Sequence, residues 1–165
     1  MNTLVFSEYP AFCQLNSEHG VTIHFRNWEE KTFTADNLEQ AKSKLYSFLV
    51  EVLNQLSAEC CLIPKPEKAL TGDLIVEVPL DVQLKILLLN SMQKNRYRKS
   101  DLAKDLNIPP QRISSFLSFK KTTNLDFFDR AFRVMGRRLT FQFNQSYKHN
   151  RDTNNFKITF MEKIA

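Results

Sequence analysis

The sequence lacks the residues on which small secreted and metal-bound domains depend. It has three cysteines, Cys13, Cys60 and Cys61, and three scattered histidines, with no Cys-x-x-Cys or His-x-x-x-His pair. A sparse and odd set of cysteines argues against a disulfide framework, and the missing ligand pairs argue against a structural zinc site. We therefore expect reduced thiols, no metal and no cofactor.

Long apolar runs are also missing. The most apolar stretch, residues 86–89, is soon followed by Asn90 and Lys94, so it is too short to span a bilayer. Residues 1–4 show neither the basic region nor the long apolar core of a signal peptide. We therefore expect a cytoplasmic protein that has no membrane partner.

Charge, in contrast, is plentiful and unevenly distributed. Residues 1–79 hold 6 Lys and Arg against 11 Asp and Glu, a net charge of −5, whereas residues 80–165 hold 17 against 7, a net charge of +10. A basic half is typical of proteins that bind a polyanion such as DNA. The acidic half would be repelled by the same polyanion, so a basic partner suits it better.

The acidic half, residues 1–79, reads as a small α+β domain of β-β-β-α-β order. Asp36 with Glu39 fits a helix capping box, and apolar residues recur at three- and four-residue steps from residue 38 to residue 56. Three strands are expected before this helix, at residues 9–15, 21–25 and 31–35, and a fourth after it, at residues 74–78.

The basic half, residues 80–143, reads as a helical domain that ends in a strand. Asp81 can cap its first helix, and Gly136 stands where the last helix would need a left-handed residue. Short helices are expected at residues 99–106, 110–117 and 125–135, followed by an alternating strand at residues 139–143. Residues 144–165 form a polar C-terminal extension, in which residues 156–160 are either one more short strand or part of a disordered tail.

Within the basic half, residues 99–116 fit a helix-turn-helix. Ala103 supplies the small residue that lets two helices cross closely, and Asn107 tolerates the positive φ that the turn needs. Pro110 suits the first turn of the second helix because its missing N–H would be unpaired there. Ile113 and Phe116 are expected to be buried, which leaves a polar outward face that suits the major groove of DNA.

The alternative is an ordinary helical bundle with a solvated polar face. The spacing of these residues, together with the charge of +10, favours DNA binding. The residues expected at DNA are Lys99, Pro110, Gln111, Arg112, Ser114, Ser115, Lys120 and Lys121.

The sequence resembles the HicB antitoxins of bacterial HicA–HicB toxin–antitoxin systems. In the second half the resemblance is carried by residues 74–80, residues 85–90, Leu102-Ala103, Leu125-Asp126 and Gly136, and in the first half by residues 9–11 and 63–66. It implies a partial RNase H-like N-terminal domain and an XRE/lambda-repressor-like helix-turn-helix domain. The sequence departs from the family pattern at Arg26-Asn27, where many members carry Pro-Asp.

The resemblance also implies the partners. These are a small basic HicA-type toxin that cleaves mRNA, the promoter DNA of the operon, and a second copy of the chain in a homodimer or in a dimer of dimers. No carboxylate set like that of a nuclease lies on strand centres, so no enzyme activity is expected.

Two further surfaces are predicted. Trp28, Glu29 and Glu30 are candidates for toxin contact, because a tryptophan flanked by acids in a loop suits a basic pocket; the alternative is that Trp28 packs on its own domain. The strand at Leu139, Phe141 and Phe143 has no evident partner in its own domain, so we expect it to build the dimer.

Three hypotheses for function remain at this stage. The first is an antitoxin that neutralises its toxin and represses its own operon. The second is a stand-alone helix-turn-helix repressor whose N-terminal domain senses a ligand or forms oligomers. The third is a nuclease.

Overall fold

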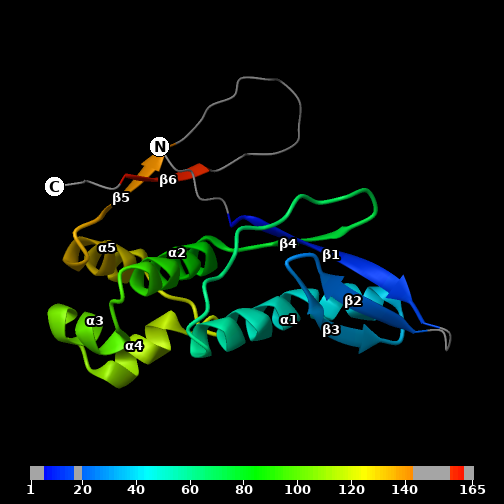
Figure 1. Ribbon diagram of the computed structural model, residues 1–165, viewed down its shortest axis with the longest axis horizontal. Coiled ribbons are helices and arrows are strands. Elements are labelled where there is room, and N and C mark those ends of the chain that lie inside the picture. Colours follow the sequence, from blue (N-terminus) through cyan, green and yellow to red (C-terminus); the bar gives the residue numbers. More distant parts are fainter. Residues whose placement is uncertain (1–5, 17–19, 143–156, 162–165) are drawn as a thin grey trace.

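The computed structural model describes residues 6–16, 20–142 and 157–161, and within these residues the fold is α+β. An antiparallel sheet with one long helix comes first, and four shorter helices follow. Figure 1 shows the sheet at one end of the molecule, the shorter helices at the other, and the long helix running from one end towards the other. The α+β class and the β-β-β-α-β order predicted for the first half are confirmed.

The first sheet has the strand order β3-β2-β1-β4, with every neighbouring pair antiparallel. Alternate residues point to opposite faces, so Ala11, Ile23 and Val76 are buried on one side of the sheet. The strands are β1 (Glu8–Leu15), β2 (Val21–Phe25), β3 (Trp28–Ala35) and β4 (Leu74–Glu77).

The long helix α1 (Leu38–Ala58) packs on the sheet through its buried face. The predicted cap at Asp36 is wrong by one residue. Asn37 is the N-cap, and its Oδ1 accepts from the backbone N–H of Gln40 at 2.9 Å. The Oε1 of Gln40 accepts from the backbone N–H of Asp36, the residue before the cap, at 2.8 Å. Asn37 and Gln40 thus satisfy the N–H groups at this helix end in place of Asp36 and Glu39.

Four helices make up the next part of the chain. Their bounds are α2 (Leu80–Lys94), α3 (Lys99–Leu106), α4 (Pro110–Leu117) and α5 (Leu125–Val134). The predictions for α3 and α4 are confirmed, and Gly136 follows α5 with the expected positive φ of 71°. Pro79, not Asp81, precedes the first residue of α2, so the cap predicted at Asp81 is wrong. None of the described helices is both long and apolar enough to cross a bilayer.

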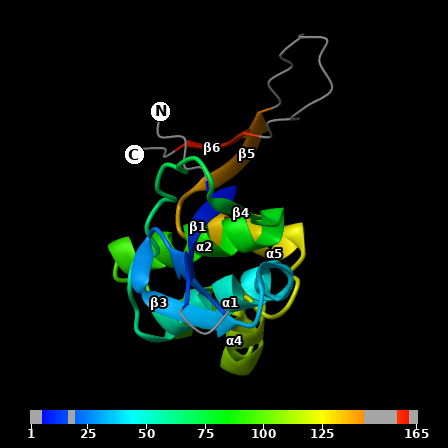
Figure 2. The same cartoon turned by 90° about the vertical axis from the view of Figure 1, so that its right-hand side faces the viewer.

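A second sheet joins β5 (Arg138–Gln142) to β6 (Lys157–Met161) in antiparallel pairing. Of the two alternatives for residues 156–160, the strand is confirmed. The strand at Leu139 was expected to have no partner in its own domain, and its partner indeed comes from the C-terminal extension: Leu139 pairs with Phe160 and Phe141 with Ile158. Phe143 lies outside the described residues. In both views, β5 and β6 extend side by side away from α2 and α5 (Figures 1 and 2).

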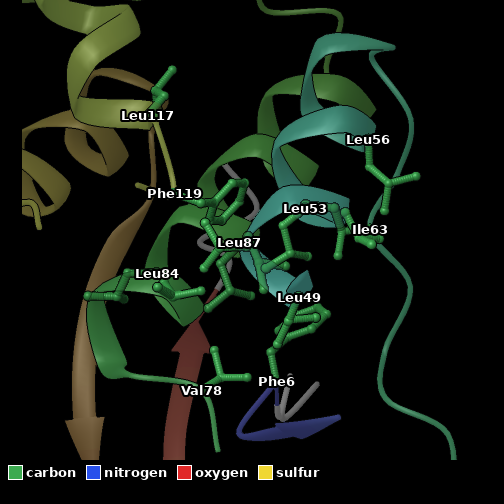
Figure 3. Close-up of a cluster of buried hydrophobic side chains, with 14 of the residues drawn as sticks. Phe6, Leu49, Leu53, Leu56, Ile63, Val78, Leu84, Leu87, Leu117 and Phe119 are labelled. Atoms are coloured by element: carbon green, nitrogen blue, oxygen red, sulfur yellow. The ribbon is translucent and has the colours of Figure 1, made fainter. Parts of the chain in front are cut away.

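One core joins the two halves of the chain. Figure 3 shows Leu53 of α1 close to Leu87 of α2, with Phe119 beside them, in a cluster that also includes Leu49 and Leu84. Asn90 adds two hydrogen bonds across this junction, because its side chain accepts from the Ile63 N–H at 2.9 Å and donates to the Ile63 carbonyl at 2.8 Å. The sheet and the helices therefore hold each other in place.

Candidate DNA-binding and partner-binding surfaces

The turn between α3 and α4 has the geometry that its sequence predicts. Asn107 adopts a left-handed conformation with φ of 53°, and the N–H of Ile108 donates to the carbonyl of Ala103 at 2.9 Å. Ala103 is buried, so a small side chain lies where the two helices pack. Pro110 is the first residue of α4, where no N–H is needed. These features fix the angle at which α4 leaves α3.

Burial divides α4 into an inner and an outer side. Ile113 and Leu117 are fully buried, whereas Phe116 is only half-buried and packs on Phe127 at 4.6 Å between ring centroids. Leu117, and not Phe116, is therefore the second deep anchor of the helix. The outer residues Gln111, Arg112 and Ser114 are exposed, and Ser115 is half-buried. The Arg112 guanidinium lies over the Phe116 ring at 5.4 Å, which limits its freedom.

Lys120 and Lys121 are exposed in the segment that joins α4 to α5, residues 118–124, which we call the 118–124 turn. The ammonium of Lys121 donates to Ser115 Oγ at 3.1 Å, so two of the predicted DNA-binding residues are in contact. Both lysines follow the end of α4 within four residues. Two positive charges therefore lie next to the polar outer side of that helix.

Three residues that the sequence did not single out hold the 118–124 turn. The ring of Phe119 is buried, and its backbone N–H donates to Asn54 Oδ1 of α1 at 3.2 Å. Lys85 of α2 donates from its ammonium to the Lys121 carbonyl. The sequence contains one indication of the role of Lys85. It lies in a helix with apolar residues on all sides, and this indicates that its side chain is buried.

Lys99, the remaining predicted DNA-binding residue, is exposed at the first position of α3. The Asp101 carboxylate fixes this helix end by accepting from the Arg98 backbone N–H at 3.0 Å. Hydrogen bonding from the Arg98 side chain lowers the pKa of Asp101 below its ordinary value. The helix end that carries Lys99 is therefore well defined.

Trp28 does not lie in a loop, contrary to the premise on which its contact with a toxin was predicted. It is the first residue of β3, is 6% exposed, and stacks on Tyr9 at 5.2 Å between ring centroids. Phe25 meets the same ring edge-on at 6.1 Å. The alternative, packing within its own domain, describes Trp28 correctly. Glu29 and Glu30 are exposed beside it.

The hairpin turn Arg26-Asn27, where the sequence departs from the family pattern, binds the long connection from α1 to β4. Arg26 donates two hydrogen bonds to Asp73, at 2.5 and 2.7 Å, and these bonds hold the pKa of the Asp73 carboxyl below its ordinary value. Asn27 donates to the Lys65 carbonyl at 2.7 Å and accepts from the Glu67 N–H at 3.1 Å. This turn therefore fixes the position of the connection.

A pair of like charges lies on the open side of the sheet. Glu8 and Glu77 are directly opposite each other in β1 and β4, and both are exposed. Ile75, 43% exposed, follows on the same face opposite Pro10. The two strands therefore place two negative charges next to each other on this face of the sheet.

Among the described residues there is no group of three or more His, Cys, Asp and Glu side chains that could hold a metal ion. The acids described above occur at most in pairs, such as Glu29 with Glu30 and Glu8 with Glu77. The described residues form two kinds of surface. One is the polar outer side of α4 beside Lys120 and Lys121, and the other is an acidic sheet with exposed apolar groups.

Comparison with known proteins adds to this picture, although no protein-family model matches the chain. Over 124 residues, 75% of this chain and 88% of the relative, it is 29% identical to Antitoxin HicB 2 of Photorhabdus laumondii subsp. laumondii. Over 132 residues, 80% of this chain and 96% of the relative, it is 25% identical to Antitoxin HicB of Escherichia coli strain K12. The chain is a homologue of the HicB-type antitoxins.

The similarity to HicB-type antitoxins extends over both halves of the molecule. A match of 132 residues is longer than either residues 1–79 or residues 80–165, so it includes parts of the sheet region and of the helical region. A second protein of Photorhabdus laumondii subsp. laumondii, Antitoxin HicB 1, is 24% identical over the same length of 132 residues. The resemblance noted in the sequence is thereby confirmed.

Proposed function

We propose that the chain is an antitoxin that binds and neutralises a HicA-type mRNA-cleaving ribonuclease and represses its own operon by binding promoter DNA. The observation that carries the DNA part is the exposed polar side of α4 between a fixed turn and two exposed lysines. The names of the homologues support the toxin as the partner. In this proposal the chain is not an enzyme.

For DNA, α3 and α4 act as a lambda-repressor-like helix-turn-helix, and α4 enters the major groove. Gln111 is placed to make bidentate bonds to adenine, and Ser114 allows close approach to the bases. Lys99, Lys120 and Lys121 contact phosphates, which positions the helix without reading sequence. Pro110, Arg112 and Ser115 border this surface.

For the toxin, the sheet region acts as a partial RNase H-like domain with an acidic surface. Glu29 and Glu30 attract a basic partner, and Trp28 contributes by holding β3 in place from within the core. Glu8 and Glu77 extend the negative surface over the open side of the sheet. Ile75 offers apolar area that a bound protein can cover.

For assembly, the chain forms a homodimer, with a dimer of dimers as the larger form. Twofold proteins of this type contact two half-sites one helical turn of DNA apart. Leu139 is buried within its own chain, so the backbone edge of β5 is the part that meets the second copy. Phe141 follows on the same strand.

The DNA part is tested by gel shifts with the DNA upstream of the gene. Gln111→Ala should cost about 1–3 kcal/mol and relax the preference at one base position. Lys121→Ala should weaken binding to all sequences and reduce the slope of affinity against salt by about one unit. Gln14→Ala, an exposed change of the same kind on β1, should alter neither. If Gln111→Ala leaves the sequence preference intact, α4 is not the recognition helix.

The toxin part is tested by co-expressing the full chain with any small basic protein that the adjacent gene encodes. We expect the two to be purified together and the growth arrest caused by the basic protein alone to be relieved. If no neighbouring product binds while the gel shift succeeds, the chain is a stand-alone repressor whose sheet region senses a ligand or forms oligomers. If the pure chain cleaves RNA in the presence of a metal ion, it is a nuclease.

A further inference from the structure

Lys85 is a lysine without access to solvent. It lies in the middle of α2 with 0% exposure, between the buried residues Leu84 and Ile86. A buried ammonium is costly unless its charge and its N–H groups find partners. Lys85 has two, the Asp81 carboxylate at 3.3 Å, one turn earlier in the same helix, and the backbone carbonyl of Lys121.

The second partner lies in the 118–124 turn, far from Lys85 in sequence. Lys121 is bound at both ends, because its carbonyl accepts from Lys85 and its ammonium donates to Ser115 Oγ at 3.1 Å. The turn has two further bonds, from the Phe119 N–H to Asn54 and from Thr123 Oγ1 to the Phe116 carbonyl at 2.7 Å. Lys85 connects this turn to α2 by a hydrogen bond.

An apolar side chain of similar length would fill the same space without the cost of burying charge. It would, however, remove the N–H donor that the Lys121 carbonyl accepts from and the cation beside the Asp81 carboxylate. Burying this charged group is costly, and its effect is to fix the peptide unit that follows Lys121, directly after the two exposed lysines of the turn.

We propose that Lys85 is a positioning residue for DNA binding: from inside the core it holds the 118–124 turn so that Lys120 and Lys121 meet phosphates beside α4. This inference rests on the proposed DNA binding. Lys85 itself does not touch DNA, since it is fully buried. Its role is to keep two phosphate contacts at a fixed distance from the side chains that read the bases.

The test compares Lys85→Met with Lys94→Met, which removes the same charge from the exposed last residue of α2. In the absence of DNA, Lys85→Met should raise the rate of amide hydrogen exchange in residues 119–123 by about tenfold or more, because the turn opens locally at lower cost. Lys94→Met should leave that rate unchanged. Lys85→Gln, which keeps an N–H donor, should lie between Lys85→Met and the wild type.

With the upstream DNA, Lys85→Met should reduce the slope of affinity against salt by about one to two units, while the base preference set by Gln111 is kept. An unchanged slope and unchanged exchange would overturn the proposal, and so would a failure of both Lys85 variants to fold. If the wild type binds no DNA, the proposed function itself fails, and the exchange measurement still shows whether Lys85 holds the turn.

Discussion

Single side chains in this protein depend on partners that lie far away in sequence. Trp28 stands between an asparagine and two acids, yet it contributes to the core because β3 begins at its position and turns it inward against Tyr9. Lys85 is charged, yet α2 buries apolar residues on all sides, and a lysine in such a helix has no exposed face to occupy. For both residues, the burial of the strand or helix that carries them decides whether the side chain is buried or exposed.

Trp28→Ala is therefore expected to act on stability. Removing a buried ring that packs on Tyr9 and Phe25 should cost about 3–5 kcal/mol of unfolding free energy. Urea denaturation followed by circular dichroism measures this cost, and Glu29→Ala, an exposed change at the next residue, should stay within about 0.5 kcal/mol of the wild type. A stable Trp28→Ala protein that no longer binds the toxin would restore Trp28 as a direct contact.

The ion pair of Arg26 with Asp73 predicts a response to pH. Hydrogen bonds from Arg26 lower the pKa of Asp73 in the folded state, so the pair stabilises the fold above the unfolded pKa of about 3.9 and loses this effect as pH falls through the lower folded value. Asp73→Asn should be less stable than the wild type at pH 7, and the difference should shrink below about pH 4. Urea midpoints at both pH values measure it; a difference that does not change with pH would contradict this account.

At the scale of helices and strands, residue type and spacing predict the features that depend only on neighbouring residues. The bounds of α3 and α4, the left-handed Asn107 and the left-handed Gly136 all follow from residue type and spacing. The pairing of β5 with β6 does not, because fourteen residues separate the two strands and nothing in either one encodes its partner. The cap of α1 was predicted one residue too early for a different reason. Both Asp36 and Asn37 satisfy the local capping pattern, so the sequence alone does not choose between them.

The dimer prediction changes with this pairing. If the outer edge of β5 meets the second copy, a chain that ends after Gln142 should remain dimeric, whereas a chain that ends after Arg137 should be monomeric and bind the upstream DNA poorly. Light scattering over a range of concentrations measures the assembly. Two dimeric truncations would remove β5 from the interface, and two monomeric ones would move the interface to the segment after Gln142.

At the scale of the whole molecule, the sequence did not predict that α1 and α2 share one hydrophobic core. Each half shows its own periodic pattern, which predicts two domains, but Phe119 and Asn54 bind the 118–124 turn to α1. A fragment ending at residue 79 would expose the apolar side of α1 that faces α2. Tests of toxin binding are for this reason made on the full chain with point variants.

The uneven charge of the whole chain predicts how it meets a basic toxin. Attraction between opposite charges accelerates association, so the association rate should fall as salt rises, while the dissociation rate, set by desolvated contacts, should change less. The double variant Glu29→Gln/Glu30→Gln should slow association by about threefold at low salt, because both acids are exposed. Stopped-flow or surface-binding kinetics with the purified neighbouring protein measures both rates.

The matched control for this double variant is Asp126→Asn/Asp129→Asn, which changes the net charge equally in α5 of the basic half. These acids form ion pairs with Arg130 at 3.9 Å and with Arg133 at 2.7 Å on the surface, where such pairs add little stability. Association with the toxin should then be unaffected or only slightly slower, because these acids lie in the basic half. Equal slowing by both double variants would show that total charge, and not the hairpin at Glu29 and Glu30, directs the toxin to the antitoxin.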